Sequence, residues 1–426
     1  MTLTEQITAI ARAAKSASRE LSRLTTQERN QVLTAMADAL DEAKPMLLEA
    51  NAQDLEVGKS MGLSASMLDR LTLNDARIAS MAAGVREVAR LPDPVGRILD
   101  ERVRPNGLRL QKISTPIGVV VIIYESRPNV TADAASLCFK TGNATILRGG
   151  KEALHSNQWI ARRMVEAGRK VLGSRFPEAA IQVVPTTDRE AVPILLSQTA
   201  YVDLCMPRGG EGLIRAVTDC SKVPVIKHYK GVCHVYVDRE ADLQMAQEIL
   251  WNAKVQRPSA CNAAETVLVD RAVAAEFLPQ AAQRLRERNV ELRGDAESLA
   301  ILGHVPGIQC KPATDTDYAT EYNDYILNVR IVDGVEAAMD HIHRYGSAHS
   351  DAIITRNEST ARRFLGEVDS AAVYWNASTR FTDGGEFGMG AEIGISTDKV
   401  GARGPMGLEE LCSYKWLCWG SGQVRA

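Results

Sequence analysis

Residues 255–266 read Val-Gln-Arg-Pro-Ser-Ala-Cys-Asn-Ala-Ala-Glu-Thr, and they decide how the rest of this chain is interpreted. A helical pattern of apolar residues precedes them over 239–253, and the short apolar run 266–269 has the length of a buried strand. Cys261 is therefore predicted on a loop between a helix and a strand. Its small neighbours would let a carbonyl approach the thiolate, a strong nucleophile. A free cysteine is also commonly a small core residue, so the loop alone leaves both interpretations open.

Length and composition predict a soluble globular protein of more than one domain. The chain has 426 residues, of which 45% are hydrophobic and 24% are charged, so we expect two domains and an appendage. The net charge of -3, without a long basic run, favours neither nucleic acid nor an anionic membrane as a partner. The longest apolar run, 117–124, is too short to span a bilayer, and residues 1–25 lack an apolar signal core. We therefore expect a cytoplasmic protein.

The cysteines and histidines do not predict a metal site. Eight cysteines are scattered singly, without a Cys-x-x-Cys pair or zinc-like spacing, which is typical of reduced thiols. His341 and His343 are two residues apart on a predicted helix and so belong to different faces.

The order of elements predicts two α/β domains with parallel sheets. Residues 96–114 alternate between polar and apolar around Asn106-Gly107, which predicts a hairpin that joins another sheet, because two strands alone are marginal. After residue 116, apolar runs alternate with helical stretches, as in sheets buried on both faces. Strands are expected at 117–123, 144–147, 181–184, 202–206 and 223–226, then at 233–237, 266–269, 326–332, 352–355 and 371–375.

Glycines at one predicted junction are candidates for phosphate binding. Gly209 and Gly210 follow the strand expected at 202–206 and precede a helix, where a phosphate could approach the helix N-terminus. An ordinary glycine turn explains them equally well on this signal alone. The common Gly-x-Gly-x-x-Gly dinucleotide motif does not follow the first strand.

Several motifs together resemble one protein family. Asn252-Ala253-Lys254, Gln256-Arg257-Pro258 and residues 261–266 resemble the nucleophile segment of the aldehyde dehydrogenase superfamily, and specifically its gamma-glutamyl phosphate reductases of proline biosynthesis. The resemblance extends over essentially the whole chain. It implies an aldehyde dehydrogenase-like α/β fold with two parallel-sheet, Rossmann-like domains and a β-hairpin oligomerisation arm.

The resemblance also assigns the domains. Residues 1–95 and 115–230 would form an NADPH-binding domain, and 231–400 a catalytic domain that carries Cys261. Residues 96–114 and 405–426 would form the arm, with a C-terminal strand near 413–417, that pairs protomers of a homo-oligomer.

In the catalytic centre, the resemblance implies that Cys261 is the nucleophile. Asn129 matches the family asparagine whose amide holds the oxyanion, together with the Cys261 backbone N–H. Arg257 and Arg380 are candidates for contacts with the substrate's carboxylate and phosphate, or else are surface residues beside the pocket.

For the cofactor, the resemblance implies a second set of residues. Arg148 matches the end of the strand that meets the adenosine ribose, and Lys151 adds a cation that favours the 2′-phosphate of NADPH. Gly209 and Gly210 match the phosphate-binding junction, and Glu321 matches a glutamate that contacts the nicotinamide ribose.

The implied reaction is NADPH-dependent reduction of L-glutamyl 5-phosphate to glutamate 5-semialdehyde, through a thioester on Cys261. A glutamate 5-kinase is a candidate partner. Hydrolysing relatives carry a glutamate that activates water; alignment on Gly231 places His228 there instead. The alternatives are a non-phosphorylating aldehyde dehydrogenase, with His228 activating water, and a catalytically inactive nucleotide-binding protein.

Overall fold

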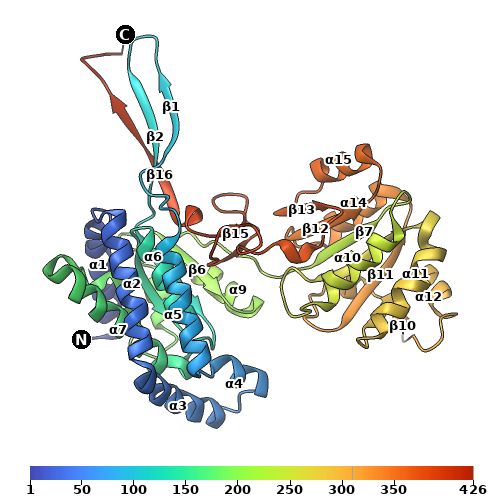
Figure 1. Ribbon diagram of the computed structural model, residues 1–426, viewed down its shortest axis with the longest axis horizontal. Coiled ribbons are helices and arrows are strands. Elements are labelled where there is room, and N and C mark those ends of the chain that lie inside the picture. Colours follow the sequence, from blue (N-terminus) through green and yellow to red (C-terminus); the bar gives the residue numbers. More distant parts are fainter. Residues whose placement is uncertain (309, 426) are drawn as a thin grey trace. The chain divides into compact units, whose positions relative to one another are not determined.

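The computed structural model describes residues 1–308 and 310–425, which form two compact units (Figure 1). Unit 1 comprises Met1–Lys227, Gly388–Gly394 and Met406–Ala426, and unit 2 comprises His228–Phe387 and Ile395–Pro405. Two details differ from the predicted domains. The boundary expected after residue 230 falls after Lys227, and Gly388–Gly394 belongs to unit 1 rather than to the second domain.

A four-stranded parallel sheet forms the centre of unit 1, in the order β5-β4-β3-β6. Every residue of β3 is buried, which explains its unbroken Val-Val-Val-Ile-Ile-Tyr sequence. The strands are β3 (Val119–Tyr124), β4 (Ala144–Arg148), β5 (Ile181–Val183) and β6 (Leu204–Arg208).

The prediction of a strand at 223–226 is wrong. Only a single bridge forms there, between Cys205 and Val225. The preceding Pro224 accepts a hydrogen bond from the Cys205 N–H at 2.9 Å, but proline has no N–H of its own with which to extend a ladder.

Helices surround this sheet. Two of them begin with capping boxes, in which Thr2 and Glu5, and then Thr25 and Glu28, bond each other's backbone N–H groups. The helices are α1 (Leu3–Leu21), α2 (Thr26–Glu42), α3 (Lys44–Ser60), α4 (Ala65–Leu71), α5 (Asp75–Arg90), α6 (Asn129–Lys140), α7 (Leu154–Leu172), α8 (Ala191–Leu196) and α9 (Glu211–Cys220).

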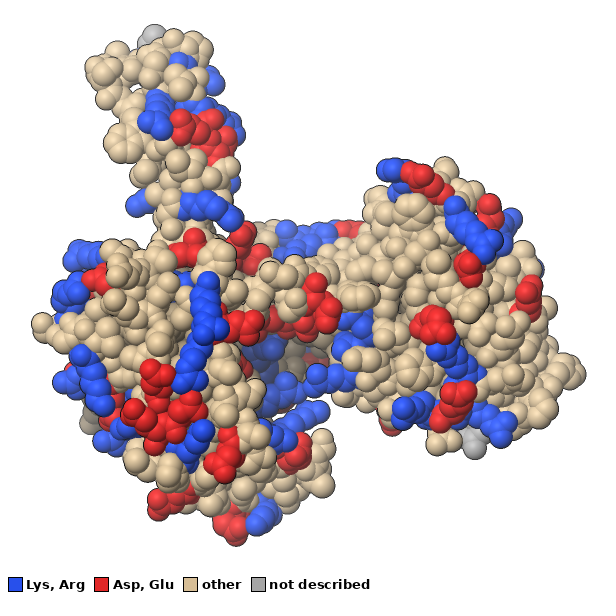
Figure 2. All heavy atoms as spheres, in the orientation of Figure 1, with Lys and Arg blue, Asp and Glu red and all other residues tan. Residues whose placement is uncertain are grey.

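The predicted hairpin and its C-terminal partner strand are confirmed. β1 (Ile98–Val103), β2 (Arg109–Pro116) and β16 (Cys412–Trp419) form an antiparallel sheet that projects as an arm in Figure 1. Gly107 has a φ of +83°, which the turn requires and glycine supplies without strain. Acidic and basic side chains lie side by side along the arm in Figure 2, and Arg109 pairs with Glu101 there.

Unit 2 is built on a seven-stranded parallel sheet in the order β10-β9-β11-β8-β7-β12-β13. Its strands are β7 (Cys233–Val237), β8 (Ala264–Asp270), β9 (Glu291–Gly294), β10 (Cys310–Pro312), β11 (Ile326–Val332), β12 (Ser350–Ile354) and β13 (Ala372–Trp375). Its helices are α10 (Leu243–Val255), α11 (Arg271–Arg286), α12 (Ala296–Leu302), α13 (Asp315–Tyr318), α14 (Gly334–Tyr345) and α15 (Glu358–Glu367). A separate pair, β14 (Gly394–Ser396) and β15 (Gly404–Met406), completes the strands.

Helix α10 begins four residues later than the sequence predicts. Asp242 accepts hydrogen bonds from the N–H groups of Gln244 and Met245 and so caps the helix, which starts at Leu243. Arg239 lies before the cap and pairs with Asp270 at 3.1 Å.

The helices of both units are too short or too polar to cross a bilayer, as far as the chain is described.

We predict that Asn143→Ala destabilises unit 1. The fully buried Asn143 side chain accepts from the Gly118 N–H and donates to the Thr141 hydroxyl and the Leu411 carbonyl, each at 2.8 Å. Because truncation leaves buried partners unsatisfied, the free energy of unfolding should fall by about 2–4 kcal/mol. Calorimetry would measure this, with the exposed Thr34→Ala as the control. A variant that unfolds at the wild-type temperature would contradict this assignment.

Candidate active site

Cys261 lies on the loop between α10 and β8, as predicted. The loop joins the amino end of β8, which is paired with β7, and β7 is paired with β12. Because the three strands are parallel, residues that precede them meet at one edge of the sheet. His228 and Gly231 lie before β7, and His349 lies immediately before β12.

Backbone contact fixes the position of the loop. A Cβ on Gly231 would lie 1.7 Å from the Cys261 carbonyl oxygen, so only glycine permits this approach. The same carbonyl accepts a hydrogen bond from the Cys233 thiol, with sulfur and oxygen 3.3 Å apart.

Asn262, next to Cys261, ties this loop to a second loop. Its buried side-chain amide donates to the backbone carbonyl of Thr382 at 2.9 Å, and the backbone carbonyl of Asn262 accepts from the Thr379 hydroxyl at 2.7 Å. Arg380 donates to the Asn262 side-chain oxygen and, at 2.8 Å, to Gln256. The sequence interpretation assigned no role to Asn262.

Two guanidinium groups accompany the thiol. Burial lowers the pKa of Arg380, and repulsion from Arg257 lowers it further, whereas attraction to Cys261 raises it. Arg257 is exposed and Arg380 is half-buried. The structure thus brings these two predicted anion-binding residues and the predicted nucleophile together within unit 2.

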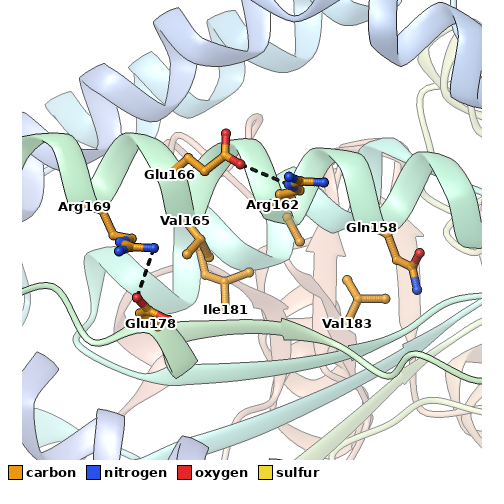
Figure 3. A pocket seen from close by; sticks show the side chains of 9 residues that line it. Gln158, Arg162, Val165, Glu166, Arg169, Glu178, Ile181 and Val183 are labelled. Atoms are coloured by element: carbon orange, nitrogen blue, oxygen red, sulfur yellow. Dashed lines mark hydrogen bonds and ion pairs between the residues drawn. The ribbon is translucent and has the colours of Figure 1, made fainter.

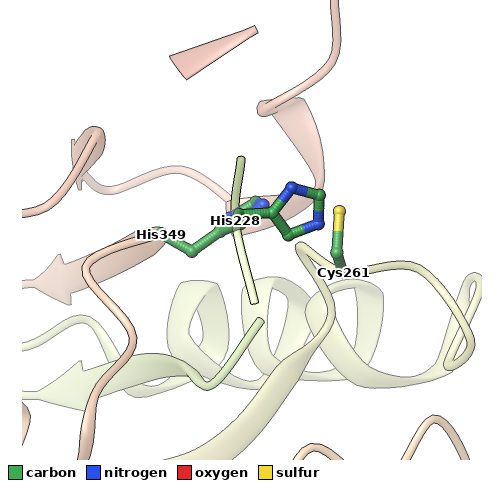
Figure 4. Close-up of side chains that lie close together, drawn as sticks. All are labelled: His228, Cys261 and His349. Carbon is green, nitrogen blue, oxygen red and sulfur yellow. The ribbon is translucent and has the colours of Figure 1, made fainter. Parts of the chain in front are cut away.

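Two histidines converge on Cys261 (Figure 4). Ligand atoms of His228, Cys261 and His349 all lie within 4.8 Å of one another. The rings of His228 and His349 meet edge to face, with centroids 5.5 Å apart. His228 thus occupies the neighbourhood that alignment on Gly231 predicted.

His349 was not identified from the sequence. Its ring is fully buried, and burial lowers its pKa to about 3. A chain of three hydrogen bonds begins at its Nδ1, which lies 2.8 Å from the Ser350 hydroxyl. The hydroxyls of Ser350 and Thr382 are 2.6 Å apart, and those of Thr382 and Tyr374 are 2.7 Å apart. A lone His-Ser pair before an apolar strand gives no signal for such a network.

Glu321 lies near a buried ion pair. Lys254 donates to Glu265 at 2.8 Å, and both side chains are buried. Burial raises the pKa of Glu265 to about 7, although attraction to Lys254 opposes this shift. Charge repulsion from Glu321 raises the pKa of Glu265 further. Burial also lowers the pKa of Lys254. Whether Glu321 contacts a ribose stays a prediction.

In unit 1, the strand order contains a topological switch point. The chain passes from β3 to β4 and β5 on one side and then returns to β6 on the other. Ligands of open α/β sheets bind at such a switch point, beyond the carboxyl ends of the strands. Glu125 follows β3 there, and its carboxylate accepts from the Gly210 N–H at 3.1 Å. This glutamate, which the sequence interpretation did not use, holds the turn where phosphate binding by Gly209 and Gly210 was predicted.

The end of β4 is cationic. Arg148 is half-buried and donates to the backbone carbonyls of Gly149 and Thr187. Its buried Nε has no hydrogen-bond partner among the described residues. Burial lowers the pKa of the Arg148 guanidinium. Attraction to Glu152 partly offsets this shift, and repulsion from the nearby Arg189 adds to it. Lys151 is exposed three residues on. Arg189 was missed because it follows a different strand.

Asn129 is the first residue of α6, and Pro128 occupies the N-cap position before it. Its exposed amide donates to the Asp133 carboxylate at 3.0 Å. Burial raises the pKa of Asp133 to about 6. The oxyanion role predicted for Asn129 stays a prediction.

A hollow in unit 1 has no comparable chemistry. It lies between α7 and β5 (Figure 3), where Arg162 pairs with Glu166 at 3.0 Å and Arg169 with Glu178 at 3.1 Å. Its charged side chains thus neutralise one another, and its lining contains no nucleophile.

Comparison with known proteins gives consistent matches. Residues 2–300 match the model of the aldehyde dehydrogenase family. The gamma-glutamyl phosphate reductase of Moorella thermoacetica is 56% identical over 412 residues, which cover 97% of this chain and 97% of that protein. That of Halothermothrix orenii is 53% identical over 425 residues, covering 100% of each.

Solved structures agree with these sequence matches. The crystal structure of the gamma-glutamyl phosphate reductase from Thermotoga maritima matches with a TM-score of 0.95 and 44% identity, over 99% of this chain and 100% of that one. The chain therefore belongs to the aldehyde dehydrogenase family, in the branch of its gamma-glutamyl phosphate reductase relatives.

Proposed function

We propose that this protein reduces L-glutamyl 5-phosphate to L-glutamate 5-semialdehyde in proline biosynthesis, with NADPH as the reductant and release of phosphate. The observation that carries the proposal is the meeting of Cys261 with two guanidinium groups on one pair of loops. A thiolate attacks acyl carbons, and guanidinium groups bind carboxylate and phosphate. The names of the full-length relatives supply the substrate.

In the first step, the Cys261 thiolate attacks the acyl carbon, the acyl–phosphate bond breaks, and a thioester forms. We propose that Arg257 and Arg380 neutralise charge on the substrate's anionic groups. Asn129 is proposed as a donor to the oxyanion, on the family pattern alone. Hydride addition to the thioester carbon then gives a hemithioacetal, which releases the aldehyde and regenerates the thiolate.

A nicotinamide cofactor would supply the hydride when bound. The residues present fit such a group: the unit 1 sheet has the switch point at which open α/β sheets bind ligands, and Arg148 has a buried, unsatisfied Nε near Arg189. We propose that Arg148 and Lys151 favour NADPH through its 2′-phosphate, with Gly209 and Gly210 near the other phosphates and Glu321 at the nicotinamide ribose.

The arm supports the further proposal of a homo-oligomer. Val103, Trp416 and Trp419 are exposed on it by 68%, 42% and 56%. Such apolar side chains on a projecting ribbon are typical of surfaces that pair with another copy. A cytoplasmic location and a glutamate 5-kinase partner are proposed from the relatives' biosynthetic role.

A non-phosphorylating dehydrogenase is the second candidate function, because His228 lies near Cys261 and could activate water against the thioester. The phosphate requirement separates the two. In the reverse direction, the phosphorylating enzyme needs phosphate to release its acyl group, whereas the alternative needs only water.

We therefore predict that, without phosphate, wild-type enzyme oxidises glutamate 5-semialdehyde at most once per Cys261 and then stalls. Hydrolysis without an efficient general base should be about 10²–10⁴-fold slower than phosphate attack. Rapid-quench measurement would show an NADPH burst no larger than the site concentration. Cys261→Ser should give no burst, and Cys220→Ser the normal one. Steady NADPH formation in phosphate-free buffer would instead establish the hydrolysing dehydrogenase.

For coenzyme choice, Arg148→Gln should weaken NADPH binding by about ten- to hundred-fold, which corresponds to loss of one charge-assisted hydrogen bond. NADH binding should change little, because NADH lacks the 2′-phosphate. Fluorescence titration measures both, with Arg169→Gln as a control on the surface of unit 1. Equal losses for the two coenzymes would remove Arg148 from this role.

For the substrate anions, Arg257→Gln should raise KM for phosphate or for the semialdehyde by about tenfold or more, through loss of a charge-assisted contact. Its melting temperature should stay unchanged because Arg257 is exposed. Arg380→Gln should raise KM and also lower the melting temperature, since Arg380 bonds Asn262 and Gln256. Arg288→Gln is the control, and unchanged KM values in both variants would place the anion site elsewhere.

A further inference from the structure

The cluster of His228, Cys261 and His349 contains chemistry that the proposed reaction does not use. One thiol and two imidazoles approach from three separate segments, and one ligand atom from each residue lies within 4.8 Å of the other two (Figure 4). Cysteine and histidine together form the usual ligand set of zinc, and three protein ligands leave a fourth position open. Bonds of about 2.0–2.3 Å to zinc place ligand atoms about 3.3–3.6 Å apart, which small side-chain rotations would achieve.

His349 provides the strongest observation. Its ring is fully buried, yet Nε2 has no hydrogen-bond partner within the described chain. A buried polar atom of this kind costs about 1–3 kcal/mol and calls for a ligand or another explanation. Meanwhile Nδ1 is held by the Ser350 hydroxyl at 2.8 Å, which fixes the ring's orientation. Metal-binding histidines are typically fixed in this way through their second nitrogen.

His228 shows the same arrangement. Its Nδ1 lies 2.7 Å from the backbone carbonyl of Ile395, and a carbonyl can only accept. Nδ1 therefore carries the proton and donates it, so in the neutral ring the lone pair is on Nε2. A metal ion would coordinate at that nitrogen, with the Ile395 carbonyl as the outer partner.

We propose that His228, Cys261 and His349 form a binding site for a thiophilic divalent cation of the zinc class, which reversibly blocks the nucleophile. On binding, the metal–sulfur bond forms as the Cys261 thiol releases its proton to solvent, and the two neutral imidazoles add without other proton loss. The metal draws electron density from the sulfur and occupies the space from which an acyl carbon would approach it, so turnover stops. The inhibitory consequence rests on the proposed function; the binding itself does not.

Cobalt(II) is the probe, because tetrahedral cobalt–thiolate centres absorb in the visible and near ultraviolet. Titration of the full-length protein, reduced without thiol reagents and free of affinity tags, should give one cobalt per chain with a thiolate charge-transfer band. Zinc should displace the cobalt, protect Cys261 from alkylation and inhibit reduction in proportion to occupancy, and a chelator should restore activity.

Matched variants identify the ligands. His349→Gln and, independently, His228→Gln should weaken metal binding by more than about 100-fold, because loss of a ligand exceeds the effect of an outer partner. His341→Gln is the control: His341 is also buried with an unsatisfied Nε2, but lies outside the cluster. Cys220→Ser controls for the other thiols. Circular dichroism and melting temperature identify misfolded variants, and His228, on a half-buried segment, supplies the test if His349→Gln does not fold.

Absence of the charge-transfer band in the wild type, or binding that survives both histidine substitutions, would overturn the metal site. A protein that reduces the acyl phosphate but binds no cobalt retains the proposed function and loses this inference. A protein that binds cobalt through these residues but lacks phosphate-dependent activity retains the site and loses the proposed function.

Discussion

The close approach of Gly231 to the Cys261 carbonyl is the constraint on which the candidate active site depends. Because a Cβ at position 231 would lie 1.7 Å from the Cys261 carbonyl oxygen, any other residue there would push the Cys261 loop away from the start of β7. That displacement would separate Cys261 from His228, which is only three residues before Gly231, and from the Cys233 thiol that bonds its carbonyl. One missing side chain thus sets the distance between the segment that leads into β7 and the loop that leads into β8.

The rest of the loop is held by polar contacts rather than by apolar packing. Asn262 joins it to residues 379–382 through backbone carbonyls, and Arg380 bonds both Asn262 and Gln256. Two neutral acceptors hold this half-buried guanidinium, so the hydrogen bonds themselves do not neutralise its charge. The same contacts that position the loop therefore also prepare it to bind a phosphate or carboxylate.

Sequence patterns predicted the elements well and the site only in part. Continuous Val/Ile runs identified most strands of both sheets, because burial on two faces leaves a strong signal; 223–226 failed because Pro224 limits pairing to one bridge. Cys261 was identifiable from its small neighbours and family motifs. His349 and Arg189 were not, because their importance arises from strands that become neighbours only in the folded sheet. The His-Cys-His cluster spans residues 228 to 349, so no spacing rule could have found it.

The position of Cys261 also determines how the thiolate of the proposed reaction would be stabilised. Reactive cysteines are commonly found at helix N-termini, where the dipole favours a thiolate. Here the loop follows the C-terminus of α10, which ends at Val255, so the helix that leads into the loop presents its negative end. The compensating charge must come from side chains, and Arg257 and Arg380 are the cations that this loop pair supplies. In the proposed reaction, their charge would serve the thiolate before the substrate binds and the departing phosphate afterwards, and Arg380, which interacts with both Arg257 and Cys261, links the two roles.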